Sequence, residues 1–391
     1  MHKGLSHSGF ERWRLRLAAS AINNAKMGSP RDCSRAVASG RYRRAAGDSR
    51  LSTRLAYRQK LVVLSVMLQP IPPALLTLYA DLAQQARYAQ RGGTVYRRAI
   101  GGASYLYAKV SVGAGRRDIF PGREDEGETQ EKAEAIRRAA SAAKDRRATI
   151  RTLKSRGLRG PEPWLGRVLD AVADAGLFAR GVVLVGAAAY QLMEPLVGRH
   201  LPDASLITGD VDLVTVDLAL KAETGESMEA ILQRADPTLS AILELDLRHF
   251  SSRFKGSEAL VEILTPILQR TDSLPLPLSE MSAAATPLQY RRWLTEDPVA
   301  ATALWGPGVP VSVPAPARYA VHKLILAQKR LRTSREKRFK YLSQAAALIE
   351  ALRQADPFAI EDALEDARRQ GTDGWEKPIS RSLAELGLSG L

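Results

Sequence analysis

From residue 67 onward, hydrophobic residues recur along the chain at the spacings typical of helices and of strands. Residues 73–89 begin with proline and repeat leucine and tyrosine at helical spacing, which predicts a helix. Two runs rich in β-branched and aromatic residues, 94–100 and 105–110, flank the turn sequence Gly101-Gly102-Ala103-Ser104 and predict a β-hairpin. The charged run 124–154 predicts a solvated helix.

The pattern changes at the Pro- and Gly-rich segment 159–163, which indicates a junction. Residues 164–177 then have the spacing of an amphipathic helix. The continuous apolar run 182–185 is typical of a buried strand, and it ends at Gly186 before a helical pattern that extends to residue 196. A strand, a glycine turn and a helix are therefore expected in this order.

Later segments complete an α+β pattern with a mixed sheet. The expected elements are a strand at 208–214, helical stretches at 227–235 and 237–244, paired strands at 247–254 and 259–264, a loop-dominated segment at 275–316 in which 311–313 adds a short strand, and helices at 318–332 and 337–354. The predicted division is a basic arm at 1–66, a module of helix, β-hairpin and charged helix at 67–157, a mixed-sheet core at 158–270, and a loop-rich connection with a C-terminal helical domain at 271–391.

The formal net charge of +15 is concentrated in the first 66 residues. They contain 14 lysines and arginines against three acidic residues, a net charge of +11, which leaves +4 for residues 67–391. Such a composition predicts a disordered or weakly helical extension, or an upstream start with Met67 as the natural first residue. An arm that contacts RNA is the alternative.

Cysteine use and hydropathy restrict the other classes of protein. Cys33 is the only cysteine, which excludes an intrachain disulfide and a cysteine metal cluster and fits a reducing compartment. The longest apolar stretch, 61–80, is interrupted by three prolines and is a poor membrane span, and the N-terminus lacks the pattern of a secretory signal. The sequence therefore predicts a cytoplasmic protein without a membrane partner.

Asp210 and Asp212 are the most prominent candidates for chemistry. They lie in the run Thr208-Gly209-Asp210-Val211-Asp212-Leu213-Val214, which predicts a strand with both carboxylates on one face. Two converging carboxylates raise each other's pKa unless a cation lies between them, and a hard divalent ion such as Mg²⁺ or Mn²⁺ fits that role. Because a D-x-D pair is expected about once by chance in a chain of this length, its meaning depends on the flanking sequence.

The flanking motifs resemble those of the nucleotidyltransferase superfamily related to DNA polymerase beta. The similar segments are Leu184-Val185-Gly186-Ala187-Ala188, Gly209-Asp210-Val211-Asp212-Leu213-Val214 and Val261-Glu262-Ile263-Leu264-Thr265-Pro266. A closer resemblance, to bacterial nucleotidyltransferase-like domain proteins, extends from the Tyr105-Leu106-Tyr107 hairpin to the segment Pro316-Ala317-Arg318-Tyr319-Ala320-Val321-His322-Lys323-Leu324. The resemblance covers residues 67–355 and implies a mixed-sheet nucleotidyltransferase core at 158–270.

This resemblance implies roles for three acids. Asp210 and Asp212 would hold the metal bound to a nucleoside triphosphate, and Glu262 would hold a second metal near the acceptor hydroxyl or act as its base. Glu262 stands where the superfamily more often has aspartate, which adds a methylene and keeps the charge. Asp217 and Asp246 are the alternative third acids.

The resemblance also implies residues that bind the nucleotide. Gly186 would let the backbone approach the phosphates, and the N–H groups of Ala187 and Ala188 would bind an anion at the start of the helix. Thr208 lies beside the D-x-D strand, and Lys323, in an apolar helical stretch, is the lysine expected to reach the triphosphate. The superfamily commonly has serine or a second glycine in place of Ala187.

The spacing of the motifs differs from the superfamily in one respect. Gly186 lies 23 residues before Asp210, so 194–207 is expected to form a loop, in which Arg199 and His200 are solvated or contact the acceptor.

The expected activity is Mg²⁺-dependent transfer of a nucleoside monophosphate from an NTP to a hydroxyl, with release of pyrophosphate. An RNA end such as that of tRNA, a protein side chain and a small molecule all remain open as the acceptor. The alternative is a non-catalytic RNA-binding or regulatory protein on a degenerate nucleotidyltransferase fold. The sequence contains no G-x-x-x-x-G-K-[ST], H-E-x-x-H or G-x-S-x-G motif, which disfavours other phosphate, zinc and serine chemistries.

Overall fold

The structure divides into two compact units. The computed structural model describes residues 68–113, 115–202, 209–223, 225–242, 250–267, 274–329 and 335–391. One unit is Gln69–His322, called here the sheet-containing unit, and the described part of the other is Leu68 with Lys323–Leu391, called the helical unit. The expectations for the basic arm, Thr208 and Asp246 lie outside the described residues, and the four-part domain division stays a prediction.

Helices and strands of different lengths make up the sheet-containing unit. Its helices are α3 Pro73–Arg87, α4 Gly127–Ser155, α5 Pro163–Asp174, α6 Gly186–Gln191, α7 Glu194–Val197, α8 Met228–Gln233, η3 Ser279–Met281 and α9 Arg291–Leu294. Its strands are β1 Gly93–Ile100, β2 Ala103–Val112, β3 Gly115–Arg123, β4 Val183–Val185, β5 Asp210–Val214, β6 Ser240–Ala241, β7 Arg253–Lys255, β8 Leu260–Pro266, β9 Leu276–Leu278, β10 Ala283–Leu288, β11 Val299–Ala303 and β12 Val309–Val313. Helix α10, Pro316–Lys329, begins here and continues into the helical unit.

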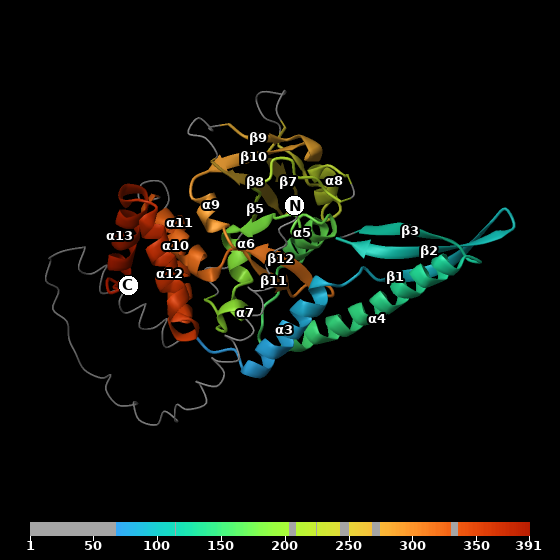
Figure 1. The fold of residues 1–391 in the computed structure, drawn as a ribbon, viewed down its shortest axis with the longest axis horizontal. Helices are drawn as coiled ribbons and strands as arrows, with labels where there is room; N and C mark the ends of the chain where they lie inside the picture. The colour runs from blue at the N-terminus through green and yellow to red at the C-terminus, as the bar shows by residue number, and fades with distance from the viewer. Residues whose placement is uncertain are drawn as a thin grey trace. The chain divides into compact units, whose positions relative to one another are not determined.

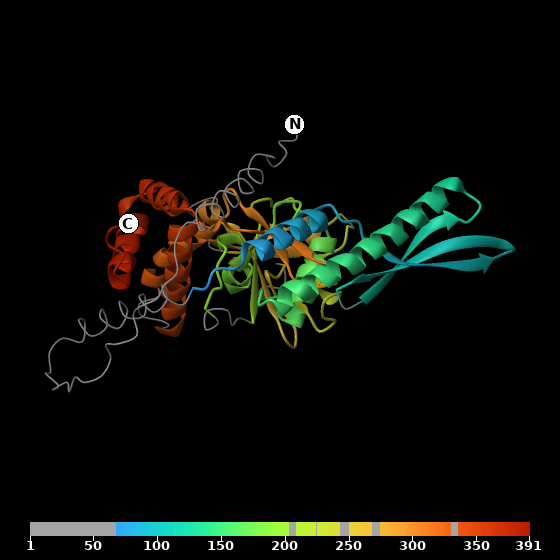
Figure 2. The same cartoon turned by 90° about the horizontal axis from the view of Figure 1, so that it is seen from below.

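A three-stranded antiparallel sheet and the long helix α4 extend from the rest of the sheet-containing unit (Figures 1 and 2). The β1–β2 pairing confirms the predicted hairpin. Leu106, Ala108 and Val110 of β2 are buried, and α4 packs against all three strands of this sheet. Strand β3 was not expected, because its sequence GRRDIFPGR lacks an alternating apolar pattern and most of its residues are exposed.

The central sheet is mixed and confirms the α+β class. Its main order is β4-β5-β8-β10-β9, with β7 also paired to β8 and β6 to β7. Strand β8 runs parallel to β5 and β10, whereas β4, β7 and β9 pair with their neighbours in the antiparallel sense. All three residues of β4 are buried, as the continuous apolar run predicted.

The segment 275–316, expected to be dominated by loops, contains four strands. Strands β9 and β10 extend the central sheet, and β11 and β12 form a separate two-stranded sheet whose second strand includes the short strand expected at 311–313. Pro277 lies in the edge strand β9, and Pro310 is the second residue of β12. Strands tolerate proline at such positions, so these prolines did not mark loops.

Two other expectations need correction. Part of the helical stretch expected at 237–244 is the short strand β6. The insert expected to be a loop at 194–207 begins with helix α7, and Glu194 at its start is only 2% exposed. A Glu194 oxygen accepts a hydrogen bond from the Leu201 N–H at 2.9 Å, and its carboxylate lies 3.6 Å from His200 Nδ1, so this segment folds back on itself.

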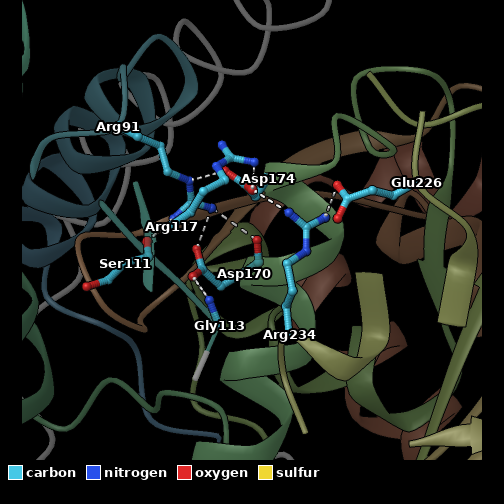
Figure 3. A network of polar contacts seen from close by, with 8 residues as sticks. All are labelled: Arg91, Ser111, Gly113, Arg117, Asp170, Asp174, Glu226 and Arg234. Atoms are coloured by element: carbon cyan, nitrogen blue, oxygen red, sulfur yellow. Dashed lines mark hydrogen bonds and ion pairs between the residues drawn. The ribbon is translucent and has the colours of Figure 1, made fainter. Parts of the chain in front are cut away.

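A network of ion pairs fastens the β1–β3 sheet to the helices beside the central sheet (Figure 3). The side chain of Asp174, at the end of α5, is 5% exposed and pairs with Arg91 at 2.5 Å and with Arg234 at 3.0 Å. Asp170 also binds Arg91, at 2.8 Å, and accepts a hydrogen bond from the Gly113 N–H at 2.9 Å. Buried charges are stable only when they are paired, so the network fixes how the sheet joins α5 and α8.

The helical unit contains the rest of α10, α11 Arg335–Ala355, α12 Pro357–Arg369, the π-turn Thr372–Glu376 and α13 Lys377–Leu386. Helices α10 and α11 confirm the helices predicted here over their described residues. The Gln328 amide donates to Ser382 at 2.9 Å, and the Ser382 hydroxyl donates to the Leu324 carbonyl at 2.7 Å, which joins α10 to α13. None of the described helices of the protein is both long and apolar enough to cross a bilayer.

Candidate active site

Strand β5 holds the D-x-D pair as expected. Val211 and Leu213 are buried at 0% and 1% exposure, whereas Asp210 is exposed and Asp212 is half-buried. Because successive side chains alternate between the faces of a strand, the two aspartates share the face opposite those apolar residues. The strong apolar character of one face therefore fixes the direction of both carboxylates.

Strand β8 brings the third acid beside this pair. In the parallel β5–β8 register Asp212 is opposite Glu262, so their side chains lie on the same face of neighbouring strands. Burial and the charges of Asp212 and Asp210 raise the pKa of Glu262. Asp217, the alternative third acid, is exposed in the loop after β5, where its carboxylate accepts a hydrogen bond from the Ala219 N–H.

The Gly186 turn lies against Asp212 from the other side. Strand β4 pairs with β5 so that Val185 is opposite Asp212, and the chain then turns into α6 at Gly186. Gly186 has φ +70°, and a Cβ placed on it would lie 2.3 Å from Asp212 Oδ2. Glycine is thus required here both for its backbone conformation and for space next to the carboxylate.

Tyr319 supports this turn from helix α10. Its hydroxyl donates a hydrogen bond to the Gly186 carbonyl at 2.8 Å, and its ring stacks on Tyr190 with the ring centroids 6.0 Å apart. Both tyrosines are fully buried, but the Tyr190 hydroxyl has no hydrogen-bond partner within the described residues. The two buried tyrosines therefore differ in one respect: the hydroxyl of Tyr319 is hydrogen-bonded to the turn, and that of Tyr190 is not.

Replacing Tyr319 with phenylalanine is expected to lower the free energy of unfolding by about 1 kcal/mol, because the Gly186 carbonyl loses its donor while the ring is kept. Turnover should fall as well, since Gly186 touches Asp212. Tyr190→Phe is the matched control and should leave both quantities unchanged or raise stability. Urea unfolding with a kcat measurement tests this, and equal effects of the two variants would show that the turn does not depend on the hydroxyl.

Two arginines near Glu262 were not expected from the sequence. Arg253 of β7 is opposite Glu262 in the antiparallel β7–β8 register, and Arg291 begins α9. Their positive charges lower the pKa of Glu262, less than burial and Asp212 raise it. They add positive charge to a site that otherwise contains three carboxylates. Nothing in the sequence of either segment indicates that its arginine lies near Glu262.

Glu262→Gln is expected to stabilise the protein in the absence of divalent ions. A carboxyl whose pKa is raised on folding contributes stability while it is protonated and loses that stability as the pH rises through the folded pKa. The neutral amide avoids this loss, so the Tm in EDTA at pH 7.5 should rise by about 2 °C, and the gain should shrink toward pH 5. Glu280→Gln, at an exposed position in η3, is the control. An unchanged or lower Tm for Glu262→Gln at pH 7.5 would contradict the electrostatic description.

The other residues expected to bind a nucleotide belong to different parts of the chain. Ala187 and Ala188 lie in the first turn of α6, directly after Gly186. Lys323 belongs to the helical unit, is 5% exposed, and its Nζ lies 4.5 Å from the ring centroid of Tyr341. Their roles toward a triphosphate stay predictions, as does that of Thr208. His200, expected to be solvated or to contact an acceptor, lies next to buried Glu194.

The three acids are gathered by strand pairing rather than by a complete cage. Within the described ranges, no group of three or more His, Cys, Asp or Glu side chains is arranged to hold a metal ion by itself. The carboxylates of Asp212 and Glu262 instead lie side by side on neighbouring strands. Arg253 follows on the β7 side of Glu262, and the Gly186 turn lies on the β4 side of Asp212.

A comparison with protein families identifies the chain. Residues 164–369, which include Gly186, the three acids and Lys323, match a family described as Nucleotidyltransferase. No curated protein and no solved structure gives a significant match. Because the matched segment is more than half of the 391 residues, the chain belongs to this family and is a nucleotidyltransferase.

Proposed function

We propose that the protein transfers a nucleoside monophosphate from an NTP to a hydroxyl of its acceptor and releases pyrophosphate. The observation that supports this most strongly is the row formed by Asp212 and Glu262 on paired strands, with Asp210 on the same face and Gly186 against Asp212. Nucleotidyl transfer requires a site that binds polyphosphate and manages its charge. Family membership favours this enzyme over the non-catalytic alternative.

The donor set fits Mg²⁺ or Mn²⁺. Asp210, Asp212 and Glu262 supply only carboxylate oxygens, which are the ligands that hard divalent ions prefer. Mg²⁺ is commonly bound by one or two carboxylates together with substrate phosphates, so an incomplete protein cage suits an ion that arrives with a triphosphate. Burial, and after it the charge of Asp212, raises the pKa of Glu262, and such an ion would offset that charge. When bound, the ion neutralises charge on the phosphate oxygens.

We assign the steps of transfer to residues of this chain. Asp210 and Asp212 would orient the triphosphate through the ion, and the Gly186 turn would let the backbone approach its phosphates. The acceptor oxygen forms a bond to the α-phosphorus while the bond from that phosphorus to the leaving pyrophosphate breaks. Glu262 completes the ion site or accepts the proton of the acceptor hydroxyl. Arg253 and Arg291 would offset negative charge during the reaction.

The remaining contacts of the nucleotide are assigned by resemblance alone. The N–H groups of Ala187 and Ala188, together with Thr208 and Lys323, are proposed to bind the triphosphate. A cytoplasmic location and the relation to DNA polymerase beta are proposed on the same basis.

The proposed reaction can be tested without knowing the acceptor. The full chain is incubated with Mg²⁺ and one of the four NTPs, labelled at the α-phosphate. Separate reactions contain total RNA, a protein extract or the small-molecule fraction of that extract. We expect label to enter one of these fractions and an equal amount of pyrophosphate to appear. Failure to release pyrophosphate from any NTP in all three mixtures would contradict the proposal.

A further inference from the structure

One face of the β1–β3 sheet carries a cluster of aromatic side chains outside the core. Alternate residues of β2 point toward α4 and are buried, so Tyr105 and Tyr107 lie on the opposite face. Tyr96 of β1 is paired with Tyr107, with the ring centroids 5.7 Å apart, and the Phe120 ring lies 5.0 Å from that of Tyr107. We call this surface the open face and define its aromatic cluster as Tyr96, Tyr105, Tyr107 and Phe120.

These rings are accessible. Phe120 is 54% exposed, and the three tyrosines are half-buried. Among the described residues, no helix packs over these rings in the way that α4 packs over the other face of the sheet. The rings contact one another, so they form a continuous apolar platform rather than scattered surface residues. Single exposed apolar residues are ordinary, but a contiguous exposed cluster marks a binding surface.

Positive charge surrounds the aromatic cluster. Strand pairing puts Arg98 opposite Tyr105 and Arg116 opposite Ser111, and Lys109 Nζ lies 5.7 Å from the ring centroid of Tyr96. Arg123, opposite Tyr105 on the other side, adds a fourth cation, which pairs with the exposed Asp125 carboxylate at 2.8 Å, and Asp118, opposite Lys109, is a second acid beside these cations. The open face is therefore basic as well as aromatic, independently of the basic arm at 1–66.

We propose that the open face binds single-stranded RNA. Base rings stack on aromatic side chains, while arginines and lysines bind the phosphates. A sheet face that carries both kinds of side chain is therefore suited to binding single-stranded nucleic acid. The hydroxyls of Tyr105, Tyr107 and Ser111 provide donors and acceptors for the ribose 2′-hydroxyl, which DNA lacks, whereas the Tyr96 hydroxyl is hydrogen-bonded to Asp118. An apolar protein partner would not require the four cations, and an acidic peptide would not require the stacked rings.

The Asp174 network gives this binding a structural consequence. Arg117 of β3, at 3.7 Å, and Arg91, just before β1, pair with Asp174 and fasten the sheet to α5, and the pair of Arg234 with Asp174 joins α5 to α8 (Figure 3). RNA on the open face would thus be held by a fixed part of the sheet-containing unit. The proposal concerns binding alone and does not require that nucleotidyl transfer occurs.

The test measures binding of a fluorescein-labelled single-stranded RNA of about 12 nucleotides to the full chain by anisotropy, without NTP or Mg²⁺. The double variant Tyr107→Leu with Phe120→Leu should weaken binding about tenfold or more, because stacking is lost. Tyr107→Phe keeps the ring, so it should weaken RNA binding far less than the double variant and lose only the preference for RNA over DNA that the Tyr107 hydroxyl provides. The double variant Arg98→Gln with Arg116→Gln should reduce the slope of log affinity against log salt by about 1.4, since two phosphate contacts are lost.

Matched controls separate the open face from the rest of the protein. Tyr88 is 69% exposed beside Arg87, and Arg147 and Arg151 are exposed on α4, so Tyr88→Leu and the Arg147→Gln, Arg151→Gln pair should leave binding unchanged. The basic arm is present in every variant and contributes equally.

Three results would overturn the proposal: no binding by the full chain, equal binding by the open-face and control variants, or equal affinity for DNA of the same sequence. Light scattering gives a fourth, because a change in self-association without a change in RNA affinity would identify a second copy of the chain as the occupant.

Discussion

Asp212→Asn is expected to reduce nucleotidyl transfer about a thousandfold or more, because the substitution removes a charge at the centre of the site while keeping the side-chain shape. Asp212 lies between Gly186 on one side and Glu262 on the other, so it is the central acid of the row. The measurement is the rate of pyrophosphate release under saturating Mg²⁺ and NTP. Thermal stability should be unchanged or higher, since the variant relieves repulsion with Glu262.

Asp217→Asn provides the matched control for this substitution. Asp217 is exposed in the loop after β5, and its Oδ1 accepts a hydrogen bond that asparagine can also accept. The control should retain full activity. If Asp212→Asn kept more than a tenth of the parent rate, or if Asp217→Asn lost as much, the assignment of the acids would be wrong.

Gly186→Ala is expected to have the second-largest effect, a loss of transfer about a hundredfold or more. The new Cβ would lie 2.3 Å from Asp212 Oδ2, so the carboxylate or the turn must move. Misplacement of about 1 Å in a catalytic group costs roughly two orders of magnitude in rate. The positive φ adds a backbone cost of about 1–2 kcal/mol. Kinetics with Mg²⁺ and NTP, together with urea unfolding, measure the two effects.

Gly225→Ala separates the backbone cost from the collision. Gly225 has φ +71°, nearly the value at Gly186, but a Cβ there meets nothing within 4 Å. This control should lose stability by a similar backbone cost and keep its activity. Equal loss of activity in both variants would show that general destabilisation, rather than displacement of Asp212, explains the effect of Gly186→Ala.

The sequence predicted the D-x-D face because a strand has a fixed period of two. Val211 and Leu213 mark the buried side, so Asp210 and Asp212 must share the other. Glu262 was identified through resemblance, and the register that puts it opposite Asp212 depends on two segments about fifty residues apart. Local patterns do not determine such pairings, which explains why Arg253 of β7 was not recognised. Arg291 was missed because it belongs to α9, whose packing against β8 is likewise a long-range contact.

Other features were missed for physical reasons. Prolines in β9 and β12 made those strands resemble loops, although edge and terminal strand positions tolerate proline. The role of Tyr319 was not predicted, because a hydrogen bond to the backbone of Gly186 leaves no mark in sequence. The tyrosines of β1 and β2 lie on the open face because α4 covers only one side of that sheet, and the hairpin pattern alone does not indicate which side is covered.

The most direct test of the central claim compares two positions of the label in one NTP. The full chain and its Asp210→Asn, Asp212→Asn double variant are each incubated with Mg²⁺ and acceptor fractions, using NTP labelled at the α- or the γ-phosphate. The carboxylate site on β5 and β8 predicts that the parent transfers the α-label, releases the γ-label as pyrophosphate, and loses both activities in the double variant. Transfer of the γ-label to an acceptor, or unchanged transfer of the α-label by the double variant, would contradict nucleotidyl transfer at this site.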